Sequence, residues 1–117
     1  MTAYFGGCHC GAVRFSFEVG PITSAMRCNC SMCRRKAGYL SAFTLTKDEL
    51  RVETASDAVG LYQFGTHVAK HHFCTTCGVH PFTETRLKPG EFRINLGCVD
   101  DLDLGALEVT DYDGQSI

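Results

Sequence analysis

The sequence predicts an all-β, or at least β-dominated, domain, and three observations carry this prediction. Residues 12–19 alternate between apolar and polar side chains, further short apolar runs follow at close spacing, and Gly, Pro or Asp residues separate the runs. Strict alternation is typical of a half-buried strand, and short strands joined by glycine-bearing turns are typical of β-rich domains. With 117 residues the chain is long enough for one domain, which we expect to span 1–117.

These apolar runs predict the positions of seven strands, taken here in chain order. The stretch AVRFSFEV at 12–19 puts Val13, Phe15, Phe17 and Val19 on one face of the first strand. Six further strands are predicted at 39–45, 50–53, 61–64, 68–73, 79–83 and 92–96. A sheet built from them would have one apolar face to bury.

Helical pattern is scarce. Thr46 and Glu49 have the spacing of a capping box on a single turn, and the segment after Cys33 is the other helical candidate. A small β domain with 8 Phe, 4 Tyr and no Trp has a limited apolar core and gains stability from an additional cross-link, of which a structural zinc is a usual kind.

Composition excludes several partners. The net charge is −2, and the only basic run is Arg34-Arg35-Lys36, so no nucleic acid or anionic membrane partner is expected. The first residues, MTAYFGGCHCGAV, lack the basic start and apolar stretch of a secretory leader, and no later run is long enough to cross a bilayer. We therefore expect a cytoplasmic protein, where its 8 cysteines indicate metal or catalysis rather than disulfides.

Four of the cysteines form two tight pairs with glycine neighbours. Cys8 and Cys10 stand in a CxC pair, and Cys74 and Cys77 stand in a CxxC pair. Each pair can point two sulfurs at one centre, and four thiolates around one ion make a closed structural zinc site. The alternative is that these residues are buried free thiols.

Cys28, Cys30 and Cys33 form a CxCxxC cluster with no fourth thiol nearby in sequence. Three protein ligands leave one place open on a tetrahedral zinc, and a substrate thiol that enters this place would be held as the nucleophilic thiolate. Two alternatives stay open. A distant ligand, namely Cys98, His71, His72 or another residue, can close the site, or Cys30 and Cys33 can form a redox dithiol.

Three motifs carry a family resemblance: GGCHCGAVRF near the start, then RCNCSMCRR, then AKHHFCTTCGVHPF. With these motifs in this order, the chain closely resembles the glutathione-dependent formaldehyde-activating enzyme family, which also contains centromere protein V. The likeness covers nearly the whole chain, and FRINLGCVDD is similar to the family's last strand and turn.

The resemblance implies a fold, an activity and two metal sites. The fold is a small β-rich ribbon related to that of the methionine-R-sulfoxide reductases. The activity is that of a zinc-dependent carbon-sulfur lyase run in reverse, in which a small thiol such as glutathione adds to a small aldehyde such as formaldehyde and gives S-(hydroxymethyl)glutathione. Up to two zinc ions are implied: a structural one at Cys8, Cys10, Cys74 and Cys77, and a catalytic one at Cys28, Cys30 and Cys33.

Basic residues near the CxCxxC cluster are candidates for substrate contacts. Arg34 and Arg35, with Lys36, follow the third cysteine and are predicted to pair with the carboxylates of glutathione or to offset the charge of a zinc-thiolate centre. The alternative is a solvated basic face. Either His71 or His72 can be the proton donor, and strand alternation puts His72 on the side of Cys74 and His71 on the opposite side.

Two other functions are compatible with the residues. One is a non-catalytic zinc module that binds a protein partner. The other is a sulfoxide reductase in which Cys98, within NLGCVDD, attacks sulfur, although this leaves the CxCxxC cluster without a role. The plain interpretation of Cys98 is a small buried hydrophobic residue.

Overall fold

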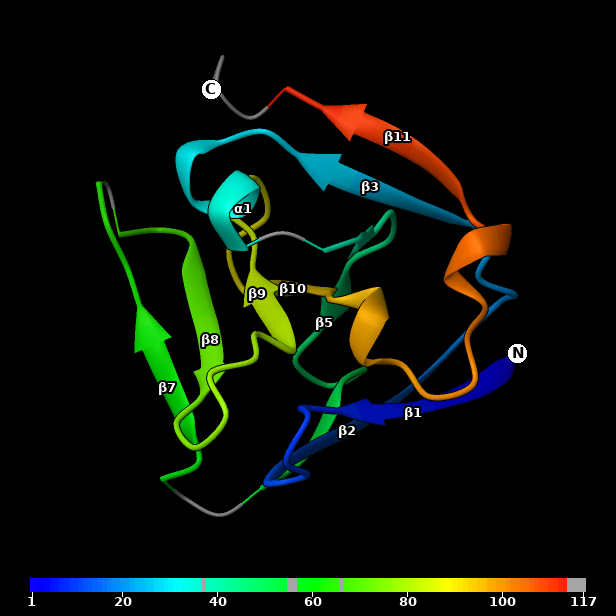
Figure 1. The fold of residues 1–117 in the computed structure, drawn as a ribbon, viewed down its shortest axis with the longest axis horizontal. Coiled ribbons are helices and arrows are strands. Elements are labelled where there is room, and N and C mark those ends of the chain that lie inside the picture. The colour runs from blue at the N-terminus through cyan, green and yellow to red at the C-terminus, as the bar shows by residue number, and fades with distance from the viewer. Residues whose placement is uncertain (37, 55–56, 66, 114–117) are drawn as a thin grey trace.

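The computed structural model describes residues 1–36, 38–54, 57–65 and 67–113, and these form three small sheets (Figure 1). The first sheet is antiparallel and has three strands. In it, β1 (Thr2–Gly7) pairs with β2 (Val13–Val19), and β2 pairs with β6 (Arg51–Thr54). The turn between β1 and β2 carries the CxC pair.

The second sheet has five strands, and each neighbouring pair is antiparallel. Its order is β5 (Leu45–Thr46), β10 (Glu91–Ile94), β9 (Phe82–Glu84), β8 (Lys70–Cys74) and β7 (Val59–Tyr62). One row across this sheet joins Tyr62, His71, Thr83 and Arg93 as successive cross-strand partners. Side chains in such a row lie on the same face of the sheet.

The third sheet brings the two ends of the chain together. Strand β11 (Glu108–Tyr112) runs parallel to β3 (Ser24–Cys28), and β3 pairs antiparallel with β4 (Leu40–Ser41). Helix α1 (Ser31–Lys36) follows β3 and lies between this sheet and the β8–β9 strands (Figure 1). Two short 3-10 helices, η1 (Leu96–Cys98) and η2 (Leu104–Ala106), precede β11.

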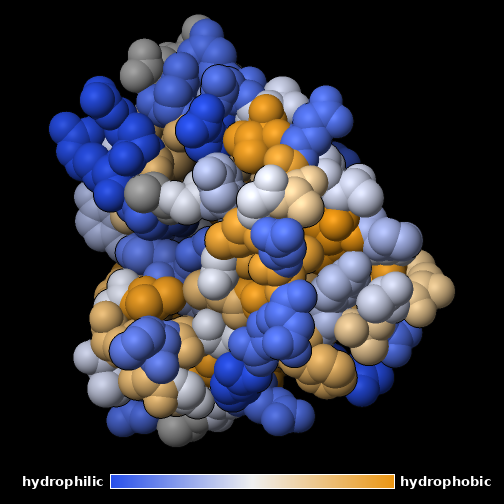
Figure 2. Space-filling view, turned by 45° about the vertical axis from the view of Figure 1, so that its right-hand side comes forward, coloured by the Kyte–Doolittle hydropathy of each residue, from blue (hydrophilic) through white to orange (hydrophobic). Residues whose placement is uncertain are grey.

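The core is built from the alternating strand that the sequence predicts. Val13, Phe15 and Phe17 of β2 are buried on one face, and Val19 packs against the same core. Phe15 meets Phe82 edge to face, with ring centroids 6.3 Å apart, and so joins the first sheet to the second. On one face of the molecule, apolar side chains also reach the surface between hydrophilic ones (Figure 2).

The β-dominated fold class is confirmed, while some predicted elements are corrected. The strand predicted at 39–45 is two short strands, because Arg93 Nη1 donates to the carbonyl oxygens of Ser41 and Ala42, at 2.9 and 3.1 Å, and so occupies the groups that a continuous strand would pair. Thr46 and Glu49 form the predicted contact of a capping box on a single turn, in which the Thr46 amide donates to Glu49 Oε1 at 2.8 Å; the turn does not continue as a helix.

Three strands were not predicted, namely β1, β3 and β11. The strand predicted at 92–96 is therefore not the last strand, since β11 follows it. Helix α1 begins at Ser31, before Cys33, whereas the sequence predicted a helical segment after Cys33. Among the described residues, no helix is long and apolar enough to cross a membrane. The likeness to the sulfoxide reductase fold and the single domain over 1–117 stay predictions.

Candidate metal centres and active site

The first sulfur cluster joins a turn of the first sheet to the end of a strand of the second sheet. Cys8 and Cys10 lie in the turn between β1 and β2, whereas Cys74 ends β8 and Cys77 lies in the turn to β9. Their four sulfurs lie within 4.8 Å of one another. Gly11 and Gly78 follow the two pairs with φ of 84° and 78°, so the positive backbone angles predicted for these turns are present.

The sulfur spacing of this cluster fits a tetrahedral zinc. Cys10 Sγ is 3.6 Å from both Cys8 Sγ and Cys74 Sγ. Four sulfurs at a Zn–S distance of about 2.3 Å are separated by about 3.8 Å, so the thiols already have close to the edge length of such a tetrahedron. Without a cation, four thiolates at this distance would repel one another strongly.

Backbone amides prepare the same sulfurs for the ionised form. Cys8 Sγ accepts from Val13 N–H at 3.3 Å, and Cys74 Sγ accepts from Thr76 N–H at 3.4 Å. A hydrogen bond from the Val79 amide, joined by one from Cys10, lowers the pKa of Cys77 to about 6. This donor set therefore fits a structural zinc, as the sequence predicts.

The second sulfur cluster is local and surrounds the start of α1. Cys28 ends β3, Cys30 directly precedes the helix, and Cys33 lies one turn on, where its amide donates to Cys30 Sγ at 3.3 Å. All three sulfurs lie within 4.8 Å of one another. Among the residues that the structure describes, no fourth Cys, His, Asp or Glu joins this group. The three sulfurs can thus hold a metal ion while one coordination place stays open.

The three thiols of this cluster differ in acidity. Burial raises the pKa of Cys28 and of Cys33. Burial also opposes ionisation of Cys30, but hydrogen bonds from the Cys33 amide and from the two other thiols outweigh it and lower the pKa of Cys30. The surroundings of Cys30 therefore favour its ionised form more than those of Cys28 and Cys33 do.

A cavity of about 530 Å³ opens beside this second cluster. Its apolar wall consists of Met26, Leu40, Phe64, Ala69, Leu87 and Tyr112. Its basic and imidazole groups come from Arg34, Arg35, Arg86, Arg93 and His71, and no described lining residue is acidic. A cavity of this volume, largely apolar with a few polar groups, is typical of a small-molecule site, and its charge favours an anionic ligand.

The predicted substrate-contact residues all line this cavity. Arg34 and Arg35 are exposed, and Arg35 Nη1 donates to the Ser31 carbonyl at 2.8 Å. His71 is 3% exposed and belongs to the lining. These positions agree with a role in substrate binding, which stays a prediction.

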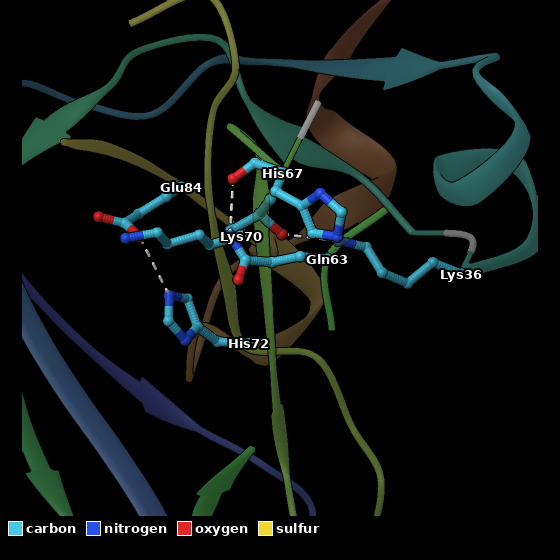
Figure 3. Close-up of polar contacts among 7 residues, drawn as sticks. Lys36, Gln63, His67, Lys70, His72 and Glu84 are labelled. Carbon is cyan, nitrogen blue, oxygen red and sulfur yellow. Dashed lines mark hydrogen bonds and ion pairs between the residues drawn. The ribbon is translucent and has the colours of Figure 1, made fainter. Parts of the chain in front are cut away.

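His72 lies on the opposite face of β8, as alternation predicts. Its ring packs against Phe82 and Phe92, with centroids 5.4 and 6.1 Å away, and Nε2 is 3.6 Å from Glu84 Oε2 (Figure 3). Burial lowers the pKa of His72. It is not among the residues that line the cavity, which leaves His71 as the histidine beside the second cluster.

Lys36, Arg86 and Arg93 are site residues that the sequence reasoning missed or grouped wrongly. Lys36 was predicted as part of one basic run with Arg34 and Arg35, but those two are exposed and Lys36 turns inward. Its spacing from Cys33, three positions along a helix, was the signal that separates it from them. Arg86 and Arg93 come from other segments of the chain, and no local pattern marks them.

Cys98 does not line the cavity beside the second cluster. It lies in η1, is 9% exposed and borders a second hollow together with Cys8. Burial raises the pKa of Cys98 to about 11, so its thiol stays protonated near neutral pH. This position matches the plain interpretation of a small buried residue.

Comparisons with known proteins show which proteins this chain resembles. The family model described as glutathione-dependent formaldehyde-activating enzyme matches residues 3–112. A protein of Halomonas elongata that is provisionally named a glutathione-dependent formaldehyde-activating enzyme is 34% identical over 97 residues. That match covers 66% of this chain and 61% of the relative, so the chain spans less than two thirds of the relative's length.

A solved structure is also similar. It is the crystal structure of a Rhodobacter sphaeroides protein from a structural genomics programme, 37% identical in sequence with a TM-score of 0.78. The match covers 91% of this chain and 99% of that protein's chain.

Proposed function

The chain belongs to the glutathione-dependent formaldehyde-activating enzyme family, and from this premise we propose that it is a carbon-sulfur lyase of the S-(hydroxymethyl)glutathione synthase type. The reaction adds the sulfur of glutathione, or of a similar small thiol, to formaldehyde or another small aldehyde. The observation that carries the proposal is the three-sulfur cluster at the edge of a basic, partly apolar cavity.

We assign the two sulfur clusters to two zinc ions with different roles. Cys8, Cys10, Cys74 and Cys77 would hold a structural zinc, and Cys28, Cys30 and Cys33 would hold a catalytic one. When bound at the second cluster, zinc supplies an open coordination place that lowers the pKa of a thiol in contact with it.

The residues of the cavity bind and orient the two substrates. Arg34 and Arg35 attract the carboxylates of glutathione, and the apolar wall around Phe64 and Leu87 excludes water from the aldehyde. A C–S bond forms between the thiolate sulfur and the carbonyl carbon, while the π electron pair of the carbonyl moves to its oxygen. That oxygen takes up the proton that the thiol released, so the net reaction joins one thiol and one aldehyde without loss of atoms.

The test is a measurement of thiol addition by the zinc-loaded protein. With ¹³C-formaldehyde and glutathione, NMR exchange rates should show formation of S-(hydroxymethyl)glutathione that is faster than the uncatalysed reaction and saturates with glutathione. Cys30→Ser should lose this activity and one zinc while its circular dichroism spectrum stays unchanged.

Cys98→Ser is the matched control, because it removes a thiol outside both clusters, and it should keep the activity and both zinc ions. Absence of turnover in the unmutated protein, together with no binding of glutathione at millimolar concentration, would reject the enzyme and favour a non-catalytic zinc module. Reduction of methionine sulfoxide by the unmutated protein, with loss of this reaction in Cys98→Ser, would instead favour the reductase alternative.

A further inference from the structure

Lys36 is a half-buried cation beside the second sulfur cluster. It is the last residue of α1, and its side chain turns inward while those of Arg34 and Arg35 stay exposed. Figure 3 shows it extended toward β8, on the side opposite to His72 and Glu84. A lysine that is partly removed from water requires partners, because the protein interior solvates an ammonium group poorly.

Its partners are two side chains that lie next to each other on the second sheet. Lys36 Nζ is 3.2 Å from His71 Nδ1 and donates to Thr83 Oγ1 at 2.6 Å. His71 on β8 and Thr83 on β9 are direct cross-strand partners, and both are buried, at 3% and 7% exposure. The sheet thus fixes both contacts of the ammonium group at once.

With Lys36 in its charged form, this geometry indicates which nitrogen of His71 carries the proton. A lysine ammonium has only donors, so Nδ1 of His71 must accept, which leaves the imidazole neutral with its hydrogen on Nε2. Burial and the charge of Lys36 both act in the same direction and lower the pKa of His71 to about 4. Burial lowers the pKa of Lys36, and the sulfurs of Cys33, Cys30 and Cys28 oppose this shift.

The ring of His71 is also held in place within the cavity wall. It stacks on Phe64, with centroids 5.8 Å apart and planes inclined by 21°, and both residues line the cavity beside the second cluster. A neutral imidazole in a fixed position can polarise a carbonyl group by donating a hydrogen bond to its oxygen.

We propose that Lys36 is a positioning residue that holds His71 as the neutral Nε2–H tautomer, and that this N–H donates to the aldehyde oxygen in the cavity. The second half of this inference rests on the proposed function. His71 then acts as a hydrogen-bond donor to the developing alkoxide rather than as an imidazolium acid. Lys36 acts only through His71, and it touches neither substrate.

The first test reads the tautomer directly and needs no turnover. Two-bond ¹H–¹⁵N correlation spectra of the zinc-loaded protein at neutral pH should show one histidine, identified by its loss in His71→Gln, with the Nε2-protonated pattern. In Lys36→Met, which keeps an unbranched side chain one atom shorter and has no donor, this signal should change to that of a tautomer mixture. The proposal would be overturned if the spectrum showed the proton of His71 on Nδ1 or on both nitrogens. It would also be overturned if the His71 signal were unchanged in Lys36→Met.

The second test is a double-mutant cycle on the rate of thiol addition. Lys36→Met should lower kcat about tenfold, with little change in the KM for glutathione, since a misplaced donor acts on the alkoxide and not on thiol binding. In a His71→Phe background the same change should have no further effect on kcat. Lys47→Met is the matched control, because Lys47 is exposed and lies outside the cavity, and it should leave kcat unchanged.

The outcomes separate this inference from the proposed function. If Lys36→Met lowers kcat equally in both backgrounds, the action of Lys36 through His71 is wrong while the thiol chemistry stands. If the unmutated protein has no turnover, the proposed function and the role toward an aldehyde are wrong, and the NMR spectra still decide the tautomer. The spectrum of the unmutated protein decides it even if Lys36→Met does not fold.

Discussion

The two sulfur clusters of this protein offer the same ligand atom, but one joins distant segments of the chain and the other is formed by neighbouring residues. The four-cysteine cluster joins the β1–β2 turn to the end of β8, residues that are more than sixty positions apart in the sequence. The three-cysteine cluster lies within the short stretch from Cys28 to Cys33 and faces a cavity. The first has a complete set of four sulfurs, whereas the second has three.

This difference predicts which cluster serves stability and which serves chemistry. A metal ion that joins distant segments replaces many tertiary contacts, so its binding energy becomes folding energy. A metal ion held by residues within six positions of the sequence contributes little to the closure of long loops. It can therefore keep an open place for a substrate without loss of the fold.

The largest expected effect comes from removing one sulfur from each cluster. Cys74 is fully buried, and Cys74→Ser should abolish folding, since a structural zinc contributes on the order of 10 kcal/mol, as much as the whole stability of a typical domain. Cys30→Ser should lose one zinc and keep a cooperative thermal transition. Metal analysis and circular dichroism melting give the comparison, and equal unfolding of both variants would show that the two clusters do not differ in this way.

A glycine substitution beside the closed cluster should have the next largest effect. A Cβ on Gly7 would collide with the Val13 carbonyl oxygen and lie 2.8 Å from Arg14 Cδ, so Gly7→Ala must displace the turn that carries Cys8. We expect a loss of about 1–3 kcal/mol in the free energy of unfolding, measured by denaturant titration with zinc present. Gly20→Ala is the control, because a Cβ there meets nothing within 4 Å, and a similar loss in it would refute the steric explanation.

The buried histidine beside the open cluster should add a pH dependence to the stability. The pKa of His71 falls from its ordinary value of 6.5 to about 4, with burial as the main cause, so the unfolded chain binds a proton in this interval that the folded protein does not. The stabilisation is present above pH 6.5 and is lost as the pH falls toward 4. Between pH 7 and pH 5 the unmutated protein should lose about 2 kcal/mol more than His71→Gln.

The measurement for this prediction is urea unfolding at several pH values with zinc in excess, so that loss of metal at low pH affects both proteins alike. His9→Gln is the matched control from the closed cluster, because His9 is exposed, and its pH dependence should follow that of the unmutated protein. A difference of the opposite sign in His71→Gln would mean that His71 is charged in the folded protein.

The smallest effect is expected at the mouth of the cavity. Arg34 is exposed, so Arg34→Ala should raise the KM for glutathione no more than about fivefold, the equivalent of an exposed ion pair worth up to about 1 kcal/mol, and should leave the melting temperature unchanged. Arg51→Ala, at an exposed arginine of β6 outside the cavity, should change neither quantity. A lowered kcat with an unchanged KM in Arg34→Ala would contradict a role in substrate binding.

The sequence by itself determined the fold class, the sulfur clusters and the family. The alternation of Val13, Phe15 and Phe17 has the period of a strand, and the spacing of CxC, CxxC and CxCxxC limits how their sulfurs can meet. Both features depend on residues that are close in the sequence, where local geometry decides the outcome.

Only the tertiary structure decided which segments form strands with distant partners and which residues from distant segments belong to the site. Strands β3 and β11 are short and pair in parallel across about eighty residues, so neither has a local signal. In the sequence, Lys36 is one member of a basic run. In the structure its surroundings differ from those of Arg34, because β8 and β9 place His71 and Thr83 side by side against it. A hydrogen bond that fixes a tautomer depends on atoms brought together from three segments, and no local pattern in a sequence encodes such a contact.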